Sequence, residues 1–98
     1  MMLKIEFHKL AEEELNEAAG YYEAEVAGLG MAFLAEVEHA IGSIREHPQA
    51  CPRILQVVRK KLLRRFPYSI LYSLVSSNVR ILAIANQKRR PLYWRNRK

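Results

Sequence analysis

Cationic side chains are the residues of this sequence whose types and spacing best suit chemistry. The stretch 59–65 reads Arg-Lys-Lys-Leu-Leu-Arg-Arg, and a second basic group, Lys-Arg-Arg, stands at 88–90. Clustered guanidinium and ammonium groups bind phosphates or acidic peptides, and they can stabilise the charge that develops when a phosphodiester is cut. The pattern therefore predicts a basic surface that meets an anionic partner.

Charge is divided unevenly between the two halves of the chain. Residues 1–50 hold all ten acidic residues, every one a glutamate, against three basic residues, a net charge of −7. Residues 51–98 hold thirteen basic residues and no acidic one, a net charge of +13, which leaves the stated formal charge of +6. Local salt bridges cannot account for this excess, so it favours a functional basic surface over a merely solvated one.

The segment 87–98 forms a basic tail that also carries aromatic residues. Arg89 and Arg90 precede Tyr93 and Trp94, and two further arginines follow. Cations beside aromatic rings suit stacking on RNA bases or anchoring in a protein groove. The alternative is that Trp94 covers the core and pins the tail, because a tryptophan buries a large apolar area. The sequence leaves both interpretations open.

Other kinds of chemistry find less support. His8, His39 and His47 do not form a His-Glu-x-x-His pattern, and Cys51 is the single cysteine, so we expect neither a metal site nor a cofactor. The glutamates fall at helical positions typical of a solvated face. No apolar run approaches the roughly 20 residues that span a bilayer, and no secretory signal is evident at the start. We therefore expect a cytoplasmic protein without a membrane partner.

The basic residues need a scaffold, and the first half of the chain predicts a strand followed by two helices. Apolar residues alternate over 3–7, which is typical of a strand with one buried face. From about residue 9 to 26 they recur at helical spacing, and a second helical pattern runs over 33–44. A short turn at 27–30 separates the two helices, and His47-Pro48 ends the second one. The helices should form an antiparallel hairpin.

The second half predicts three strands, over 57–66, 68–75 and 79–85, after a loop at 48–56. Pro67 should mark a bend, because proline cannot donate a hydrogen bond within a sheet. The whole chain, 1–98, is then one α+β domain with the order β-α-α-β-β-β. Its helical hairpin should pack on one face of a small antiparallel sheet, with the first strand beside a later one. The other face would be free to carry cations.

Two segments of the sequence resemble the RelE/ParE superfamily of bacterial toxins. They are residues 62–72, which include Arg-Arg-Phe-Pro-Tyr, and residues 79–94, an apolar strand with a basic end. The helical hairpin and the order of elements agree with this family. The resemblance implies a toxin of a type II toxin–antitoxin system, of the kind also labelled plasmid stabilisation. It also implies a cognate antitoxin as partner, in a toxin–antitoxin hetero-oligomer.

The resemblance leaves the target of the toxin open between two branches. RelE-like members are implied to cut messenger RNA on the ribosome, and ParE-like members are implied to poison DNA gyrase. The helices and the Phe-Pro-Tyr segment look more ParE-like. However, Asn86 stands where ParE-like relatives commonly have histidine, and Gln87 stands where the nucleases have an arginine. A degenerate toxin that still binds its antitoxin is a third alternative.

Each branch implies its own set of site residues. If the chain is a nuclease, the implied set is Lys60, Lys61, Arg65, Arg89 and Tyr93. If it binds gyrase, we expect the target contacts to come from Arg64, Arg65, Asn86, Arg89, Arg90, Tyr93 and Trp94. Neither set requires a metal ion or a cofactor.

Overall fold

The computed structural model describes residues 3–98, and Met1 and Met2 lie outside them. The elements are β1 (Lys4–Phe7), α1 (Lys9–Glu25), α2 (Leu29–Glu46), β2 (Arg53–Leu55), β3 (Val58–Leu62), β4 (Tyr68–Val75) and β5 (Asn78–Asn86). The predicted α+β class and order of elements are confirmed, with β2 as an additional strand.

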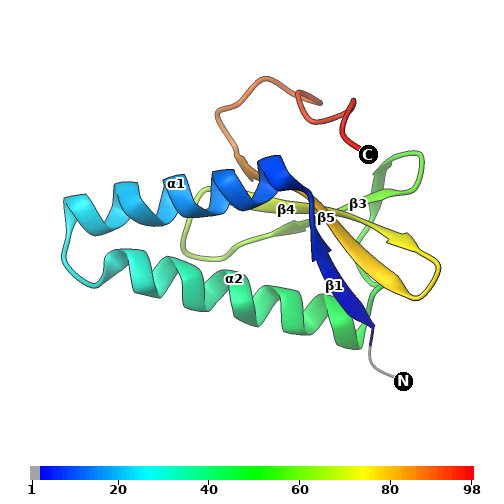
Figure 1. The fold of residues 1–98 in the computed structure, drawn as a ribbon, viewed down its shortest axis with the longest axis horizontal. Helices are drawn as coiled ribbons and strands as arrows, with labels where there is room; N and C mark the ends of the chain where they lie inside the picture. Colours follow the sequence, from blue (N-terminus) through cyan, green and yellow to red (C-terminus); the bar gives the residue numbers. More distant parts are fainter. Residues whose placement is uncertain (1–2) are drawn as a thin grey trace.

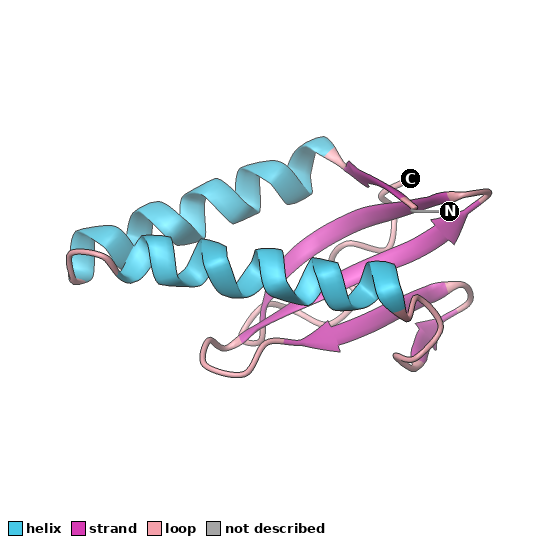
Figure 2. Cartoon of the chain, turned by 90° about the horizontal axis from the view of Figure 1, so that it is seen from below, coloured by secondary structure: helices cyan, strands magenta, loops and turns pink. Residues whose placement is uncertain are grey.

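The two helices form the predicted antiparallel hairpin on one side of the sheet (Figures 1 and 2). Gly28 precedes α2 with a positive φ of 88° and offers no side chain to cap the helix. The carboxylate of Glu23 in α1 replaces that cap, because it accepts hydrogen bonds from the amides of Gly28 at 2.8 Å and Gly30 at 2.9 Å. A Cβ at Gly30 would lie 2.4 Å from the carbonyl oxygen of Ala19, so the two helices approach closely there.

The sheet is mixed rather than wholly antiparallel. Its strand order is β1-β5-β4-β3-β2, and β1 lies parallel to β5 while the other neighbours are antiparallel. The hairpin carries the chain from β1 across the sheet face, so β1 reaches β5 as a parallel edge strand. This confirms the expectation that the first strand returns beside a later one and corrects the expected all-antiparallel pairing.

The region 48–66 differs from its predicted form in two ways. Residues 53–55 lie in the predicted loop but form β2, and the turn into β3 is made by Gln56 with a positive φ of 50°. The strand β3 ends at Leu62, because Leu63 and Phe66 turn into the core and are each 7% exposed. The alternation expected over 57–66 therefore stops before the arginine pair, and Pro67 lies in the bend as predicted.

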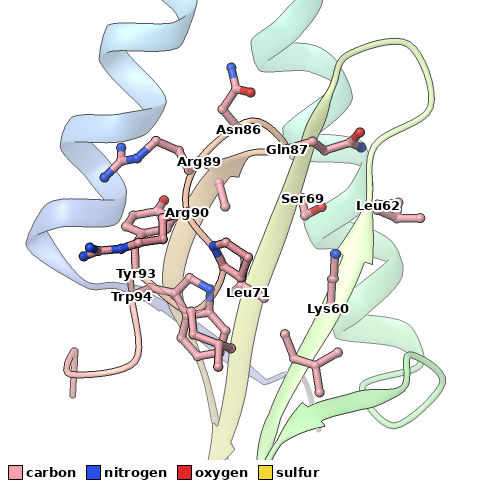
Figure 3. Close-up of a pocket in the computed structure, with 14 residues that line it drawn as sticks. Lys60, Leu62, Ser69, Leu71, Asn86, Gln87, Arg89, Arg90, Tyr93 and Trp94 are labelled. Carbon is pink, nitrogen blue, oxygen red and sulfur yellow. The ribbon is translucent and has the colours of Figure 1, made fainter.

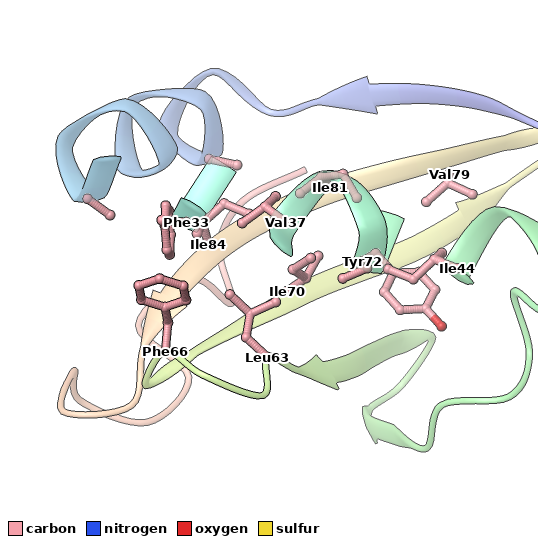
Figure 4. Packing of buried hydrophobic residues seen from close by; sticks show 13 residues of the cluster. Phe33, Val37, Ile44, Leu63, Phe66, Ile70, Tyr72, Val79, Ile81 and Ile84 are labelled. Atoms are coloured by element: carbon pink, nitrogen blue, oxygen red, sulfur yellow. The ribbon is translucent and has the colours of Figure 1, made fainter. Parts of the chain in front are cut away.

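The main core fills the space between the helices and one face of the sheet (Figure 4). Phe33 of α2 packs edge-on against Phe66, with ring centroids 5.1 Å apart. Tyr72 of β4 is fully buried, and its hydroxyl donates a hydrogen bond of 2.9 Å to the carbonyl of Pro48. This bond fixes the chain where it leaves α2, so the core and the β2 region are held together.

The second face of the sheet is covered in part by the C-terminal tail. Leu71 of β4 and Ala83 and Ala85 of β5 form a second buried cluster with Trp94. The expectation that this whole face stays free for cations is therefore wrong. Apolar residues on both faces of β4 and β5 required a second cover, and the tail supplies it.

Candidate functional site

The tail, residues 87–98, folds back over the sheet in a series of turns (Figure 1). The reversal begins at Asn86, whose Oδ1 accepts a hydrogen bond of 2.8 Å from the amide of Lys88. Trp94 is only 4% exposed and packs on the second face of the sheet. The tail is thus an ordered part of the fold. Trp94 packs as expected for a residue that covers the core, which was one of the two interpretations left open by the sequence.

The carboxylate of Glu14 in α1 ties the tail to the edge of the sheet. Its Oε2 accepts hydrogen bonds from the Tyr93 hydroxyl at 2.7 Å and from Nη2 of Arg97 at 2.9 Å. Its Oε1 accepts from Nη1 of Arg97 at 2.8 Å and from the amide of Ile84 at 3.0 Å. The Ile84 amide lies beyond the end of β1, where β5 has no strand partner on its β1 side, so Glu14 satisfies an open edge.

The hydrogen bonds at Glu14 decide its protonation state. Burial alone would raise its pKa, but hydrogen bonds from Arg97, Tyr93 and the Ile84 amide outweigh burial and hold the pKa below its usual value. The pKa of the Tyr93 phenol is shifted in the opposite direction. Burial and the hydrogen bond to Glu14 raise the pKa of Tyr93 well above its usual value. The Tyr93 hydroxyl therefore stays protonated and is committed to Glu14.

Two guanidinium groups lie over the ring of Tyr93. The Cζ of Arg89 is 3.9 Å from the ring centroid, and that of Arg97 is 5.0 Å from it. These cation–π contacts hold the Arg89 side chain against Tyr93, although Arg89 as a whole remains exposed to solvent. Arg90 is also exposed, so the tail presents two adjacent cations to a partner.

A pocket of about 440 Å³ opens between the tail and strands β3 and β4 (Figure 3). Its lining residues are Ile54, Lys60, Leu62, Ser69, Leu71, Ala85, Asn86, Gln87, Arg89, Arg90, Pro91, Leu92, Tyr93 and Trp94. Three of these side chains are cationic and none is acidic or a histidine. The pocket combines apolar walls with a positive rim.

The arginine pair after β3 is positioned by a glutamate of the second helix. The carboxylate of Glu36 accepts hydrogen bonds from the amides of Arg64 and Arg65, the latter at 3.1 Å, and it also contacts Nε of Arg65 at 3.4 Å. Burial would raise the pKa of Glu36, but these amide hydrogen bonds outweigh it and lower the pKa. The Arg65 side chain is still 69% exposed, so the loop is fixed while its cations face solvent.

Comparison with known proteins agrees with this architecture. Residues 5–91 match the family described as "ParE toxin of type II toxin-antitoxin system, parDE". The chain belongs to the ParE toxin family. A solved structure titled "Chromosomal ParDE TA system from P. aeruginosa" has the same fold, with a TM-score of 0.73 and 18% sequence identity. The match covers 87% of this chain and 96% of that one, and no curated protein matches.

Within this ParE fold the residues expected for a nuclease do not form one group. Lys60 and Arg89 line the pocket, and Tyr93 forms part of its wall. Lys61 lines a separate hollow beside Glu36 of α2, because successive residues of a strand point to opposite faces. Arg65 pairs with the same glutamate. The two lysines are thus on different faces of the sheet.

The residues expected to bind the target occupy two neighbouring regions. Asn86, Arg89, Arg90, Tyr93 and Trp94 all line the pocket. Arg64 and Arg65 lie in the loop that follows β3 and are exposed. The role of these residues in target binding stays a prediction.

Sequence reasoning missed the two glutamates that position the site. The expectation that the glutamates form only a solvated face is wrong for Glu14 and Glu36. Each lies on the buried stripe of its helix, three residues after the fully buried Ala11 and Phe33 respectively. That spacing was the available signal.

Within residues 3–98, no helix is long and apolar enough to cross a bilayer. The same described residues contain no group of three His, Cys, Asp or Glu side chains placed to hold a metal ion.

Proposed function

We propose that this chain is a ParE-like toxin that inhibits DNA gyrase by binding it and that a cognate antitoxin neutralises it. The observation that carries the proposal is the family match over residues 5–91, combined with the chemistry of the pocket. The pocket is rimmed by cations, and no histidine or carboxylate lines it. Such a site favours holding an anionic surface over cutting a phosphodiester.

The lack of a histidine or a carboxylate in the pocket lining supports binding over cleavage. RNA cleavage requires a group that removes a proton from the attacking hydroxyl. Asn86 has no such acid–base capacity, and its Oδ1 is engaged by the Lys88 amide. The Tyr93 hydroxyl is protonated and donates to Glu14.

The proposed target contacts are the exposed cations of the loop and the tail. The backbone amides of Arg64 and Arg65 donate hydrogen bonds to Glu36, and the guanidinium of Arg89 lies over the ring of Tyr93. Arg90 follows at the pocket rim. Asn86 and Tyr93 contribute by shaping the pocket, and Trp94 contributes by fixing the tail on the sheet.

The antitoxin should contribute an acidic and apolar segment that folds on the toxin, either as a helix on the hairpin or as a strand at the sheet edge. Its carboxylates would neutralise part of the +13 charge of residues 51–98. The toxin–antitoxin hetero-oligomer should form in the cytoplasm. Affinity should fall with added salt without vanishing, because apolar contacts persist. A complex indifferent to salt and to Arg64→Glu with Arg65→Glu would contradict this.

Induced expression tests the target. We expect loss of DNA supercoiling activity and induction of DNA-damage signalling, while messenger RNA remains intact. Arg89→Ala with Arg90→Ala should remove both effects. Lys4→Ala serves as the control, because it removes an exposed cation beside Asn78, at the end of β5 opposite to the one that leads into Arg89 and Arg90.

Rapid cleavage of translated messages with normal gyrase activity would instead favour the RelE-like endonuclease. Under that alternative Lys60→Ala, Lys61→Ala and Tyr93→Phe should each slow cleavage. Antitoxin binding with neither effect would indicate a degenerate toxin.

A further inference from the structure

The floor of the tail pocket contains a buried hydroxyl without a partner. Ser69 of β4 is 2% exposed, and among the described residues its Oγ is one of the buried side-chain atoms that make no hydrogen bond. Buried polar atoms are nearly always paired, so an unpaired one at the bottom of an open pocket points to a missing acceptor or donor. A serine hydroxyl can supply a proton to an incoming oxygen.

A cation stands beside that hydroxyl. Leu62 pairs with Ser69 and Lys60 pairs with Leu71 in the β3–β4 register, so Lys60 is the diagonal neighbour of Ser69 on one face. Figure 3 shows the Lys60 ammonium and the Ser69 hydroxyl facing the same space. Neither ion pair of the described residues involves Lys60. A hydrogen-bond donor and a cation without a salt bridge thus line the same part of the pocket.

The surroundings of this point are apolar. Leu71, Ala85 and Trp94 line the pocket and are buried, while Leu62 and Ile54 at its rim are 59% and 40% exposed. Exposed aliphatic side chains beside a basic pocket suit a segment that carries both apolar and acidic residues.

A nucleic acid fits the same pocket less well. Bases bind proteins by stacking on free aromatic faces. Trp94 is 4% exposed, and the ring of Tyr93 is already covered by the guanidinium of Arg89 at 3.9 Å. The aromatic residues of the pocket are therefore occupied within the fold.

We propose that this pocket is a carboxylate subsite in which the Ser69 hydroxyl and the Lys60 ammonium bind a glutamate or aspartate side chain from an apolar segment of the antitoxin. The proposal rests on the proposed function for the identity of the partner. The chemistry of the subsite depends only on the pocket and can be tested separately.

The first experiment uses the complete chain and a synthetic probe, acetyl-Leu-Glu-Leu-amide, with acetyl-Leu-Gln-Leu-amide as its matched control. Trp94 is the single tryptophan of the chain and lines the pocket, so its fluorescence reports entry, and amide NMR shifts at Ser69 and Ala85 locate the probe. The glutamate peptide should bind about tenfold more tightly than the glutamine peptide, because a charge-assisted hydrogen bond replaces a neutral one.

Variants then identify the groups. Lys60→Met should weaken binding of the glutamate peptide about tenfold, and Ser69→Ala should weaken it severalfold. Both substitutions should reduce the preference for the glutamate peptide over the glutamine peptide. Lys4→Met removes the same charge at the opposite sheet edge and should change nothing. Equal affinity for the two peptides, absence of binding, or tighter binding of a short oligouridylate would overturn the subsite.

The second experiment measures the affinity of the complete chain for its cognate antitoxin. Lys60→Met should weaken the complex about tenfold relative to Lys4→Met. If wild-type chain and antitoxin do not associate, the proposed function fails, and the peptide experiment still decides whether the pocket selects a carboxylate. If they associate and Lys60→Met has no effect, the subsite is wrong and the toxin–antitoxin pairing stands.

Discussion

The guanidinium of Arg97 forms two parallel hydrogen bonds with the carboxylate of Glu14, 83 residues earlier in the chain. Both side chains are largely buried, with 12% and 14% of their surfaces exposed. This ion pair joins the first helix to the tail. The Tyr93 hydroxyl and the Ile84 amide also donate hydrogen bonds to the same carboxylate. The Glu14 carboxylate therefore holds the tail at the edge of β5, together with the hydrogen bonds from Arg97 to the Leu82 carbonyl and from Arg80 to the Lys98 carbonyl.

Glu14→Ala should destabilise the protein by about 3 kcal/mol, because it leaves a largely buried guanidinium, a phenol and an amide without their acceptor. Urea denaturation measures this loss, and trypsin cleavage in the tail should become faster. Glu13→Ala, at an exposed neighbouring position, is the matched control and should change stability by less than about 0.5 kcal/mol. Similar stability of the two variants would contradict the attachment role.

Stability should fall in acid. Hydrogen bonds lower the folded-state pKa of Glu14 and Glu36 below the unfolded value of 4.5, so their contribution is complete above that pH and is lost as the pH falls through the folded-state pKa. Denaturation midpoints between pH 7 and pH 3 measure the decline. Glu14→Gln should flatten the curve below about pH 4.5, and an unchanged slope would contradict the assignment.

A separate loss of stability should occur at weaker acidity through His8. Its Nδ1 accepts a hydrogen bond of 3.0 Å from the Leu10 amide at the start of α1, which requires a neutral ring. Burial and the charge of Arg80 lower the pKa of His8 below 6.5. Folding therefore favours the neutral form, and stability declines as the pH falls below 6.5. His8→Asn, which keeps a capping acceptor, should remove this component.

Substitutions at Trp94 and at Arg90 should have different effects on stability and on toxicity. Trp94→Ala should cost about 3–5 kcal/mol, because it empties the cluster on the second face of the sheet. Arg90→Ala should leave the melting temperature unchanged and reduce toxicity, because the residue is exposed at the pocket rim. Lys98→Ala is the control for loss of charge. Deletion of 91–98 should abolish toxicity and, by removing Trp94, also lower the melting temperature.

The two glycines of α2 should respond oppositely to alanine. At Gly30 the new methyl group would meet the carbonyl of Ala19 at 2.4 Å, so Gly30→Ala should separate the helices and destabilise the protein by about 1–3 kcal/mol. At Gly42 nothing lies within 4 Å, so Gly42→Ala should stabilise it by about 0.5–1 kcal/mol. Thermal denaturation of the pair checks this, and equal effects would contradict the close approach.

Ser69→Ala should keep or raise the stability of the free protein by about 1 kcal/mol, because it removes a buried hydroxyl that has no hydrogen-bond partner. A large destabilisation by Ser69→Ala would contradict the unpaired state of the hydroxyl.

Local sequence patterns predicted the helices and most strands well. Contacts between residues far apart in the sequence were harder to predict. Helical spacing and the Phe-Pro-Tyr bend located α1, α2 and β4, because each signal lies within one segment. The role of Glu14 depends on an edge amide 70 residues away, which periodicity does not report. The sequence left open whether Trp94 covers the core, because the tail carries no regular period that would show which face it packs on. Strand β2 was missed because its three residues have too short a pattern.

The parallel pairing of β1 with β5 has a consequence for biosynthesis. Lys4 lies opposite Asn78, so the first strand to leave the ribosome waits for the fifth strand before it can join the sheet. β5 is also the strand that the Glu14 carboxylate and the tail complete. A nascent chain interrupted before residue 78 lacks the strand that joins β1 to β4, so prematurely terminated products should be unfolded substrates for proteases rather than partly active toxins.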